Sequence, residues 1–101
     1  MVQRIDLERF EAEVLKNPLP VLLEIYAPWC PRCAMLEDVV EQFAIEQKGR
    51  IKVFRMDEEK AERLMMRYGI NRVPAFLAFR NGRLTGIAQG ITEKKTLEEL
   101  I

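Results

Sequence analysis

The sequence contains no histidine, so it lacks the commonest metal ligand and the usual acid–base group at neutral pH. It also lacks an excess of charge of either sign, because 16 Lys and Arg residues balance 16 Asp and Glu residues. Nucleic-acid-binding surfaces usually carry a basic excess, so we expect no nucleic-acid partner. No apolar run approaches the roughly 18 residues that a membrane-spanning helix needs, and we expect no membrane partner.

Cysteine is scarce as well, with two residues in the segment Cys30-Pro31-Arg32-Cys33. Disulfide-stapled small domains usually carry four or more cysteines, and a bridge across so short a loop would constrain the unfolded chain little. A tetrahedral zinc site needs about four ligands, so a zinc ion or an iron–sulfur cluster would require the cysteine pairs of two chains. The favoured interpretation is therefore redox chemistry of the pair, with no metal or other cofactor; a metal cluster bridging a dimer is the alternative.

The remaining composition suits one domain. The chain has 101 residues, and 49% of them are hydrophobic, which is enough to bury a core without staples. We expect a single domain over residues 1–101 that acts as a monomer. Residues 1–6 are too polar to open a signal peptide, so we expect a cytoplasmic location.

Hydrophobic periodicity and turn residues predict alternating strands and helices. The run Val21–Tyr26 is apolar apart from Glu24, which is typical of a central strand covered on both faces. Asn81-Gly82 lies between two apolar runs and predicts a hairpin. The order β-α-β-α-β-α-β-β-α predicts an α/β fold with a central mixed sheet flanked by helices on both faces. The expected strands are 2–5, 21–26, 51–56, 75–79 and 84–88, and the expected helices run from Asp6 to Asn17, from Pro31 to Gly49, over 58–68 with Asp57 as cap, and at the C-terminus.

Cys30 falls at the start of the helix that follows the central strand. Free amide groups and the helix dipole there favour an anion, and the thiolate is the reactive form of cysteine. Cys33 lies three residues further on, so both sulfurs lie on neighbouring surface of one helical turn. This spacing predicts a mechanism in which Cys30 attacks a partner's disulfide and Cys33 then resolves the mixed disulfide.

Three segments together resemble the thioredoxin family over nearly the whole chain. Ala27-Pro28-Trp29-Cys30-Pro31-Arg32-Cys33 is similar to the family's active-site segment, usually WCGPC, and Gly90 matches the glycine after its last strand. Val73-Pro74 followed by residues 75–82 resembles its second signature. The resemblance implies the thioredoxin fold and a protein-disulfide oxidoreductase with no cofactor beyond the redox-active Cys30–Cys33 disulfide. Its partners would be disulfide-containing proteins and a disulfide reductase as electron donor.

The resemblance also implies roles for individual residues. Cys30 would be the exposed nucleophile and Cys33 the more buried resolving thiol. Pro74 would be cis beside the two sulfurs, leaving the backbone of Val73 to pair with an extended substrate strand, with Gly90 in the same substrate-binding surface. The alternative is a trans proline at a strand start.

Trp29 would cover the site and offer an apolar docking surface to substrates. The alternative for Trp29 is plain packing in the core.

Glu24 interrupts an otherwise apolar strand, and burial of a carboxylate raises its pKa. The resemblance places an acid, usually Asp, at this position, and we expect Glu24 to serve as acid and base for Cys33, directly or through a water. The alternative is a residue at the strand rim whose carboxylate reaches solvent. Thioredoxins often place a lysine near this acid, but Val53 stands there and Lys52 should point to the opposite face. We therefore expect Glu24 to lack a cationic partner and its pKa to rise further.

The dipeptide Pro31-Arg32 departs from the family's Gly-Pro. A cation at Arg32 would stabilise the Cys30 thiolate and make the disulfide more oxidising; the alternative is a solvated arginine without effect. Pro31 is similar to glutaredoxins, so a glutathione-dependent enzyme is an alternative and glutathione a candidate partner, although the glutaredoxin Gly-Gly-x-Asp loop is absent. A third alternative is a non-enzymatic module that binds a partner through Trp29 and Val73.

Overall fold

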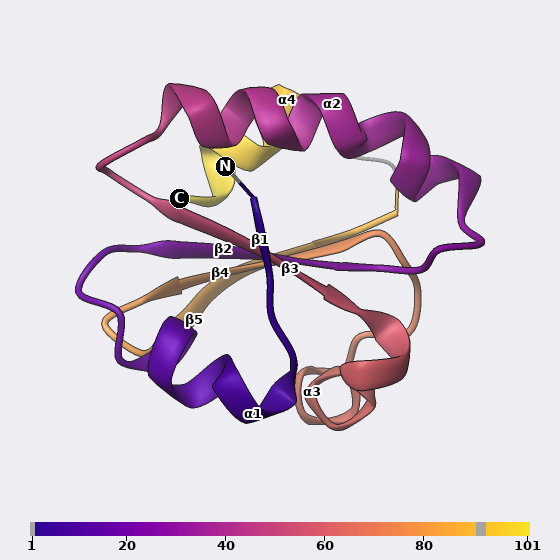
Figure 1. Cartoon of the computed structure of the whole chain (residues 1–101), viewed down its shortest axis with the longest axis horizontal. Helices are drawn as coiled ribbons and strands as arrows, with labels where there is room; N and C mark the ends of the chain where they lie inside the picture. Colours follow the sequence, from indigo (N-terminus) through magenta and orange to yellow (C-terminus); the bar gives the residue numbers. More distant parts are fainter. Residues whose placement is uncertain (1, 91–92) are drawn as a thin grey trace.

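The computed structural model describes residues 2–90 and 93–101 as a five-stranded mixed sheet between two layers of helices (Figure 1). The strands lie in the order β1-β3-β2-β4-β5, with β1, β3 and β2 parallel to one another and β4 and β5 antiparallel to their neighbours. The predicted α/β fold and its order of elements are confirmed. The strands are β1 (Gln3–Arg4), β2 (Val21–Tyr26), β3 (Lys52–Asp57), β4 (Ala75–Arg80) and β5 (Arg83–Gln89).

The helices cover both faces of the sheet (Figure 1). On one face lie α1 (Leu7–Phe10), its continuation η1 (Glu11–Leu15) and α3 (Glu62–Tyr68); on the other lie α2 (Pro31–Glu46) and α4 (Lys94–Leu100). Several predicted boundaries are shifted by one to three residues, and the first helix ends at Leu15 instead of Asn17. The helix α2 ends three residues before Gly49, and Asp57 caps the short 3₁₀ turn η2 (Glu58–Lys60) instead of one continuous helix.

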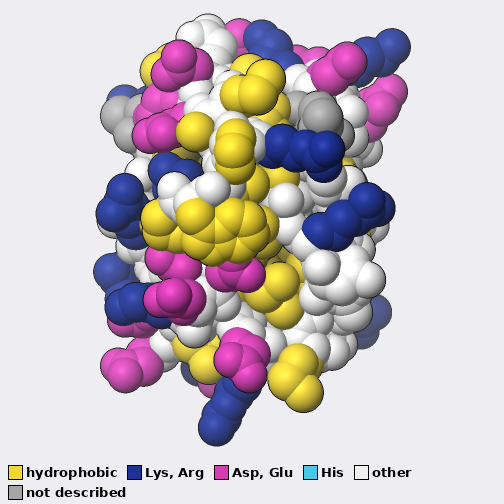
Figure 2. Space-filling model, turned by 90° about the vertical axis from the view of Figure 1, so that its right-hand side faces the viewer, with side chains coloured by type: hydrophobic (Ala, Val, Ile, Leu, Met, Phe, Trp, Pro, Cys, Tyr) yellow, Lys and Arg dark blue, Asp and Glu magenta, His cyan; other side chains and the backbone are white. Residues whose placement is uncertain are grey.

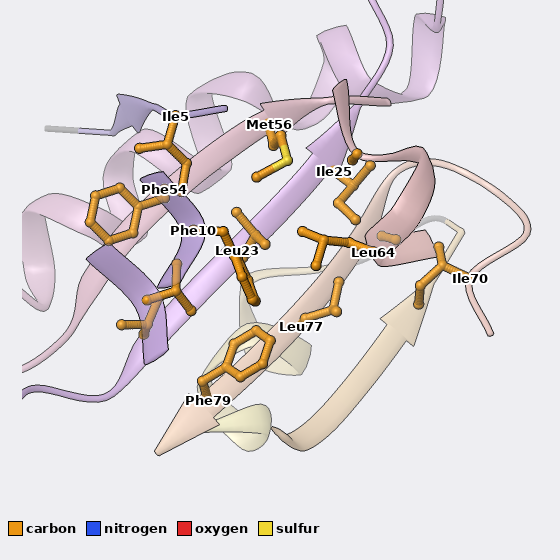
Figure 3. Close-up of a cluster of buried hydrophobic side chains, with 14 residues drawn as sticks. Ile5, Phe10, Leu23, Ile25, Phe54, Met56, Leu64, Ile70, Leu77 and Phe79 are labelled. Carbon is orange, nitrogen blue, oxygen red and sulfur yellow. The ribbon is translucent and has the colours of Figure 1, made fainter. Parts of the chain in front are cut away.

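Side chains of β2 alternate between the two faces, and this alternation decides which layer each residue meets. Leu23 and Ile25 enter the core beneath α1 and α3, whereas Leu22 packs toward α2. Glu24 and Tyr26 share the α2 face with Leu22, so the sequence position of Glu24 sends its carboxylate toward the helix that carries the cysteines. Figure 3 shows the hydrophobic core between the sheet and the layer of α1 and α3. The helices contribute Phe10 and Leu64, and the strands contribute Leu23, Ile25, Phe54, Met56, Leu77 and Phe79.

The predicted hairpin between β4 and β5 is confirmed. Asn81 and Gly82 both adopt positive φ, 53° and 77°, as a two-residue turn of this kind requires. A Cβ atom on Gly82 would lie 2.9 Å from the backbone oxygen of Leu15, so the turn also packs closely on η1.

Candidate active site

Cys30 ends the turn between β2 and α2 and caps the helix. Its backbone is extended (φ −93°, ψ 109°), and its Sγ accepts a hydrogen bond from the Cys33 N–H at 3.2 Å. Pro31 is the first residue of α2. A backbone N–H at this position would have no acceptor within the helix, so proline loses no hydrogen bond there. The sulfur therefore lies where the amide groups and dipole of a 16-residue helix stabilise negative charge.

Both cysteines are free thiols, and both are buried. Cys30 is 6% exposed and Cys33 is 2% exposed. The expectation of an exposed Cys30 is therefore wrong for the residue as a whole, because it packs against Tyr26 and Val73; Cys33 is the more buried of the two, as predicted. Cys30 and Cys33 line a pocket of about 280 Å³ that also includes Tyr26 and Arg55.

The environment of Cys33 favours the protonated thiol. Its pKa is raised to about 12, mainly by burial and then by the hydrogen bond with the Cys30 side chain. A hydrogen bond with the backbone of Ala27 lowers the pKa by less. Cys33 is therefore a thiol at neutral pH and needs a base before it can act as a nucleophile.

The loop before β4 brings Val73 and Pro74 to Cys30. The Cys30 thiol lies 4.0 Å from the carbonyl oxygen of Val73, and the Val73–Pro74 peptide bond is cis, so the trans alternative is wrong. Behind Pro74, the N–H of Gly90 donates to its carbonyl oxygen at 2.9 Å. The structure thus brings together Cys30, Val73, Pro74 and Gly90 from positions up to 60 residues apart in the sequence.

Trp29 is 72% exposed, so packing in the core is excluded for this side chain. It directly precedes Cys30 in the sequence. Figure 2 shows the right-hand side of the view in Figure 1, where hydrophobic side chains gather in the middle of the surface. Pro31 and Arg32 are exposed on the first turn of α2.

Glu24 is 1% exposed, so the alternative of a residue at the strand rim is wrong. It lies opposite Arg55 on β3, and Nε of Arg55 is 3.5 Å from Oε1 of Glu24. The expectation that the acid lacks a cationic partner is therefore wrong as well. Arg55 is two residues beyond Val53 and so shares its face of the strand, and the long side chain reaches the carboxylate.

Burial raises the pKa of Glu24 to about 7; Arg55 lowers it, and Glu37 raises it. The predicted upward shift is confirmed, but Arg55 opposes it. A carboxyl group with this pKa can both accept and donate a proton near neutral pH.

Three residues that the sequence reasoning did not assign complete the surroundings of this acid. The guanidinium of Arg55 lies 3.9 Å from the ring centre of Tyr26, and its Nη1 lies 3.8 Å from Oε1 of Glu37. Glu37 follows Cys33 by four residues, a helical spacing that could have found it. Among the described residues, Oε2 of Glu24 has no hydrogen-bond partner, and a pocket of about 10 Å³ beside it has room for roughly one water.

Comparison with known proteins agrees with this geometry. The family model named Thioredoxin matches residues 1–101. The chain belongs to the thioredoxin family. It is 33% identical to a thioredoxin of Rickettsia bellii over 101 residues, which is all of this chain and 96% of that protein. It is 35% identical to a thioredoxin of Porphyra purpurea over 92 residues, or 91% of this chain and 86% of that protein. It is 33% identical to the chloroplastic thioredoxin M4 of Arabidopsis thaliana over 92 residues, or 91% of this chain and 48% of that protein.

Membership of the thioredoxin family, with two cysteines on one helical turn, makes this protein a thiol–disulfide oxidoreductase. The glutaredoxin-like and non-enzymatic alternatives are not favoured. In residues 2–90 and 93–101, no three side chains of the metal-binding types lie close enough to hold an ion. Over the same ranges, no helix has both the length and the apolar composition needed to cross a bilayer.

Proposed function

We propose that this thioredoxin-family protein reduces disulfides of other proteins, with Cys30 as nucleophile, Cys33 as resolving thiol and Glu24 as the acid and base for Cys33. The observation that carries the proposal is the position of the Cys30 sulfur at the start of α2, where it accepts the N–H of Cys33 at 3.2 Å. Amide groups at such a position stabilise the thiolate that starts thiol–disulfide exchange.

The reaction proceeds in two exchanges. The Cys30 thiolate attacks one sulfur of the substrate disulfide, forms a mixed disulfide and releases the other substrate sulfur as a thiolate, which takes a proton from solvent. The thiol of Cys33 then gives its proton to the carboxylate of Glu24, directly or through a water, and its sulfur attacks Sγ of Cys30. The second substrate thiolate leaves, so the substrate gains two electrons and the enzyme keeps a Cys30–Cys33 disulfide. A disulfide reductase returns the two electrons.

The proposed substrate-binding surface surrounds Cys30. Trp29 supplies exposed apolar area, and Val73 and Pro74 lie beside the sulfur, where an extended segment of substrate would pass. Gly90 supports this surface from behind through its hydrogen bond to Pro74.

Pro31 and Arg32 are proposed to tune the reduction potential, since Arg32 adds a positive charge to the helix turn that follows Cys30. An equal potential for the wild type and Arg32→Gly would contradict this role.

We further propose a single domain over residues 1–101 that acts as a monomer in the cytoplasm without a cofactor. A dithiol that works as a reductant needs a compartment in which thiols stay reduced, and this requirement supports the cytoplasm. Glutathione stays a candidate electron donor, which a reduction assay with glutathione as the only reductant would test.

The test is a trapping experiment with Cys33→Ser. Without the resolving thiol, Cys30 should hold substrates as mixed disulfides that mass spectrometry detects after capture from a cell extract. Cys30→Ser is the matched control and should trap nothing. Adducts on Cys33 in the control, with none on Cys30 in the first variant, would reverse the two roles.

A further inference from the structure

A groove begins at Trp29, the residue next to the nucleophile. It has a volume of about 500 Å³ and lies between Trp29 and the segment that runs from η2 through α3. Trp29 and Met66 are 72% and 77% exposed and line the same groove, and exposed apolar side chains that adjoin one another mark interaction surfaces. Methionine is flexible and adapts to different partners. The apolar lining consists of Trp29, Met65, Met66 and Ile70.

The rest of the lining is acidic. Glu58, Glu59 and Glu62 face this groove, and among the described residues none of the three carboxylates forms an ion pair. One of their oxygens, Oε2 of Glu58, is buried and accepts no hydrogen bond from the described part of the chain. A buried acceptor of this kind is costly unless a donor arrives, and a cationic donor suits a carboxylate best.

The basic residues of the same segment face elsewhere. Arg63 and Arg67 line a separate pocket with residues of α1, and Lys60 lines another pocket near Arg4. Within η2 and α3, the side chains of Glu58, Glu59 and Glu62 therefore lie on the side of Trp29, and the Lys and Arg side chains lie on other sides. In Figure 2, acidic side chains lie beside the hydrophobic ones near the middle of the face, and Lys and Arg side chains lie on either side of this patch.

We propose that this groove selects disulfide substrates whose reacting cysteine is flanked by an apolar residue and by Lys or Arg. The inference rests on the proposed function, because the occupant is the substrate segment next to the disulfide that Cys30 attacks. The apolar residue would pack on Trp29 and the methionines, and the cation would meet the carboxylates of Glu58, Glu59 and Glu62. A second copy of this chain fits poorly, since two such acidic faces repel each other.

The test compares two disulfide-linked peptides that differ only in the residues flanking one cysteine, Lys and Arg in the first and Gln in the second. The wild type should show a KM about fivefold lower for the basic peptide at low salt, and the difference should shrink at 0.5 M salt because exposed ion pairs are weak and screened. The triple variant Glu58→Gln, Glu59→Gln, Glu62→Gln should lose this preference. Its rate on the small neutral substrate bis(2-hydroxyethyl) disulfide should stay unchanged.

A matched control variant carries Glu8→Gln, Glu98→Gln and Glu99→Gln, which change the net charge equally on exposed positions outside the groove. It should keep the preference for the basic peptide. Equal KM values for both peptides in the wild type, or loss of the preference in the control variant, would overturn the proposal. A wild-type dimer that the triple variant abolishes would also overturn it, because the occupant would be a second copy. Failure to reduce even the small disulfide would instead refute the proposed function.

Discussion

The burial of Glu24 makes the folded state sensitive to pH in a defined direction. Its pKa is about 7 in the folded protein against 4.5 when it is unperturbed, mainly because burial disfavours the charged form. The folded state therefore holds a proton on Glu24 between pH 4.5 and 7 that the unfolded state has released. The contribution of protonated Glu24 to the free energy of unfolding is fully present below pH 4.5 and is lost as the pH rises through the folded pKa of about 7.

The size of this loss follows from the two pKa values. One pH unit of difference corresponds to about 1.4 kcal/mol, so a rise from 4.5 to about 7 corresponds to about 3 kcal/mol. The side chain is almost fully buried, so solvent screening does not reduce this value. Cys33 does not contribute in the same range, since its pKa of about 12 keeps it protonated.

The measurement uses Glu24→Gln, which keeps the size and polarity of the side chain but cannot ionise. The free energy of unfolding of the reduced variant and the reduced wild type is measured with urea at intervals from pH 4 to pH 8. The variant's free energy minus that of the wild type should increase by about 3 kcal/mol over this range. Taking the difference cancels the titration of all other groups, and the exposed Glu8→Gln serves as control. A difference that does not change with pH would refute the argument from burial.

Three further changes have expected outcomes. Arg55→Met should raise the pKa of Glu24 by about one to three pH units, because a nearby cation lowers it; a carboxyl NMR titration that shows no rise contradicts this. Gly82→Ala should destabilise the fold more than Gly49→Ala in urea unfolding, about 2 kcal/mol or more against about 1 kcal/mol. Both glycines have positive φ, but only at Gly82 would the new Cβ lie 2.9 Å from a backbone oxygen, so equal losses would argue against this contact. Trp29→Ala should change the free energy of unfolding by less than about 0.5 kcal/mol, since the side chain is 72% exposed, yet raise the KM for protein disulfides. An unchanged KM would remove Trp29 from the docking surface.

Features that depend on local sequence were predictable. The Asn81-Gly82 turn needs two positive φ angles, which these residue types allow, and the structure has them. The apolar run around Glu24 identified a strand covered on both faces, and that alone predicted a buried carboxylate with a raised pKa. The break at Ala61 was not predictable in the same way. Ala61 is fully buried at φ −108° and ψ 9°, so packing of α3 on the sheet overrides the helical pattern of residues 58–68.

The partner of Glu24 needed information that a single sequence does not carry. Alternation along β3 places Arg55 on the right face, but the pairing of Glu24 with Arg55 depends on how β2 and β3 are aligned. That alignment pairs residues 31 positions apart in the sequence and is fixed by the packing of the whole sheet. The expectation of an acid without a cation considered Val53 and Lys52 alone, and the register of the two strands places Arg55 opposite Glu24 instead.

The pKa values of Glu24 and Cys33 are consistent with the order of steps in the proposed mechanism. In the free enzyme the pKa of Cys33 is higher than that of Glu24, so transfer of the proton from Cys33 to Glu24 is unfavourable. Part of this barrier comes from Cys30, whose side chain and negative charge raise the pKa of Cys33. A mixed disulfide on Cys30 carries no negative charge, so this part disappears when a substrate is captured. In the proposed mechanism, Cys33 would therefore stay protonated until Cys30 has reacted, and Glu24 would take its proton at the step where the resolving thiolate is needed.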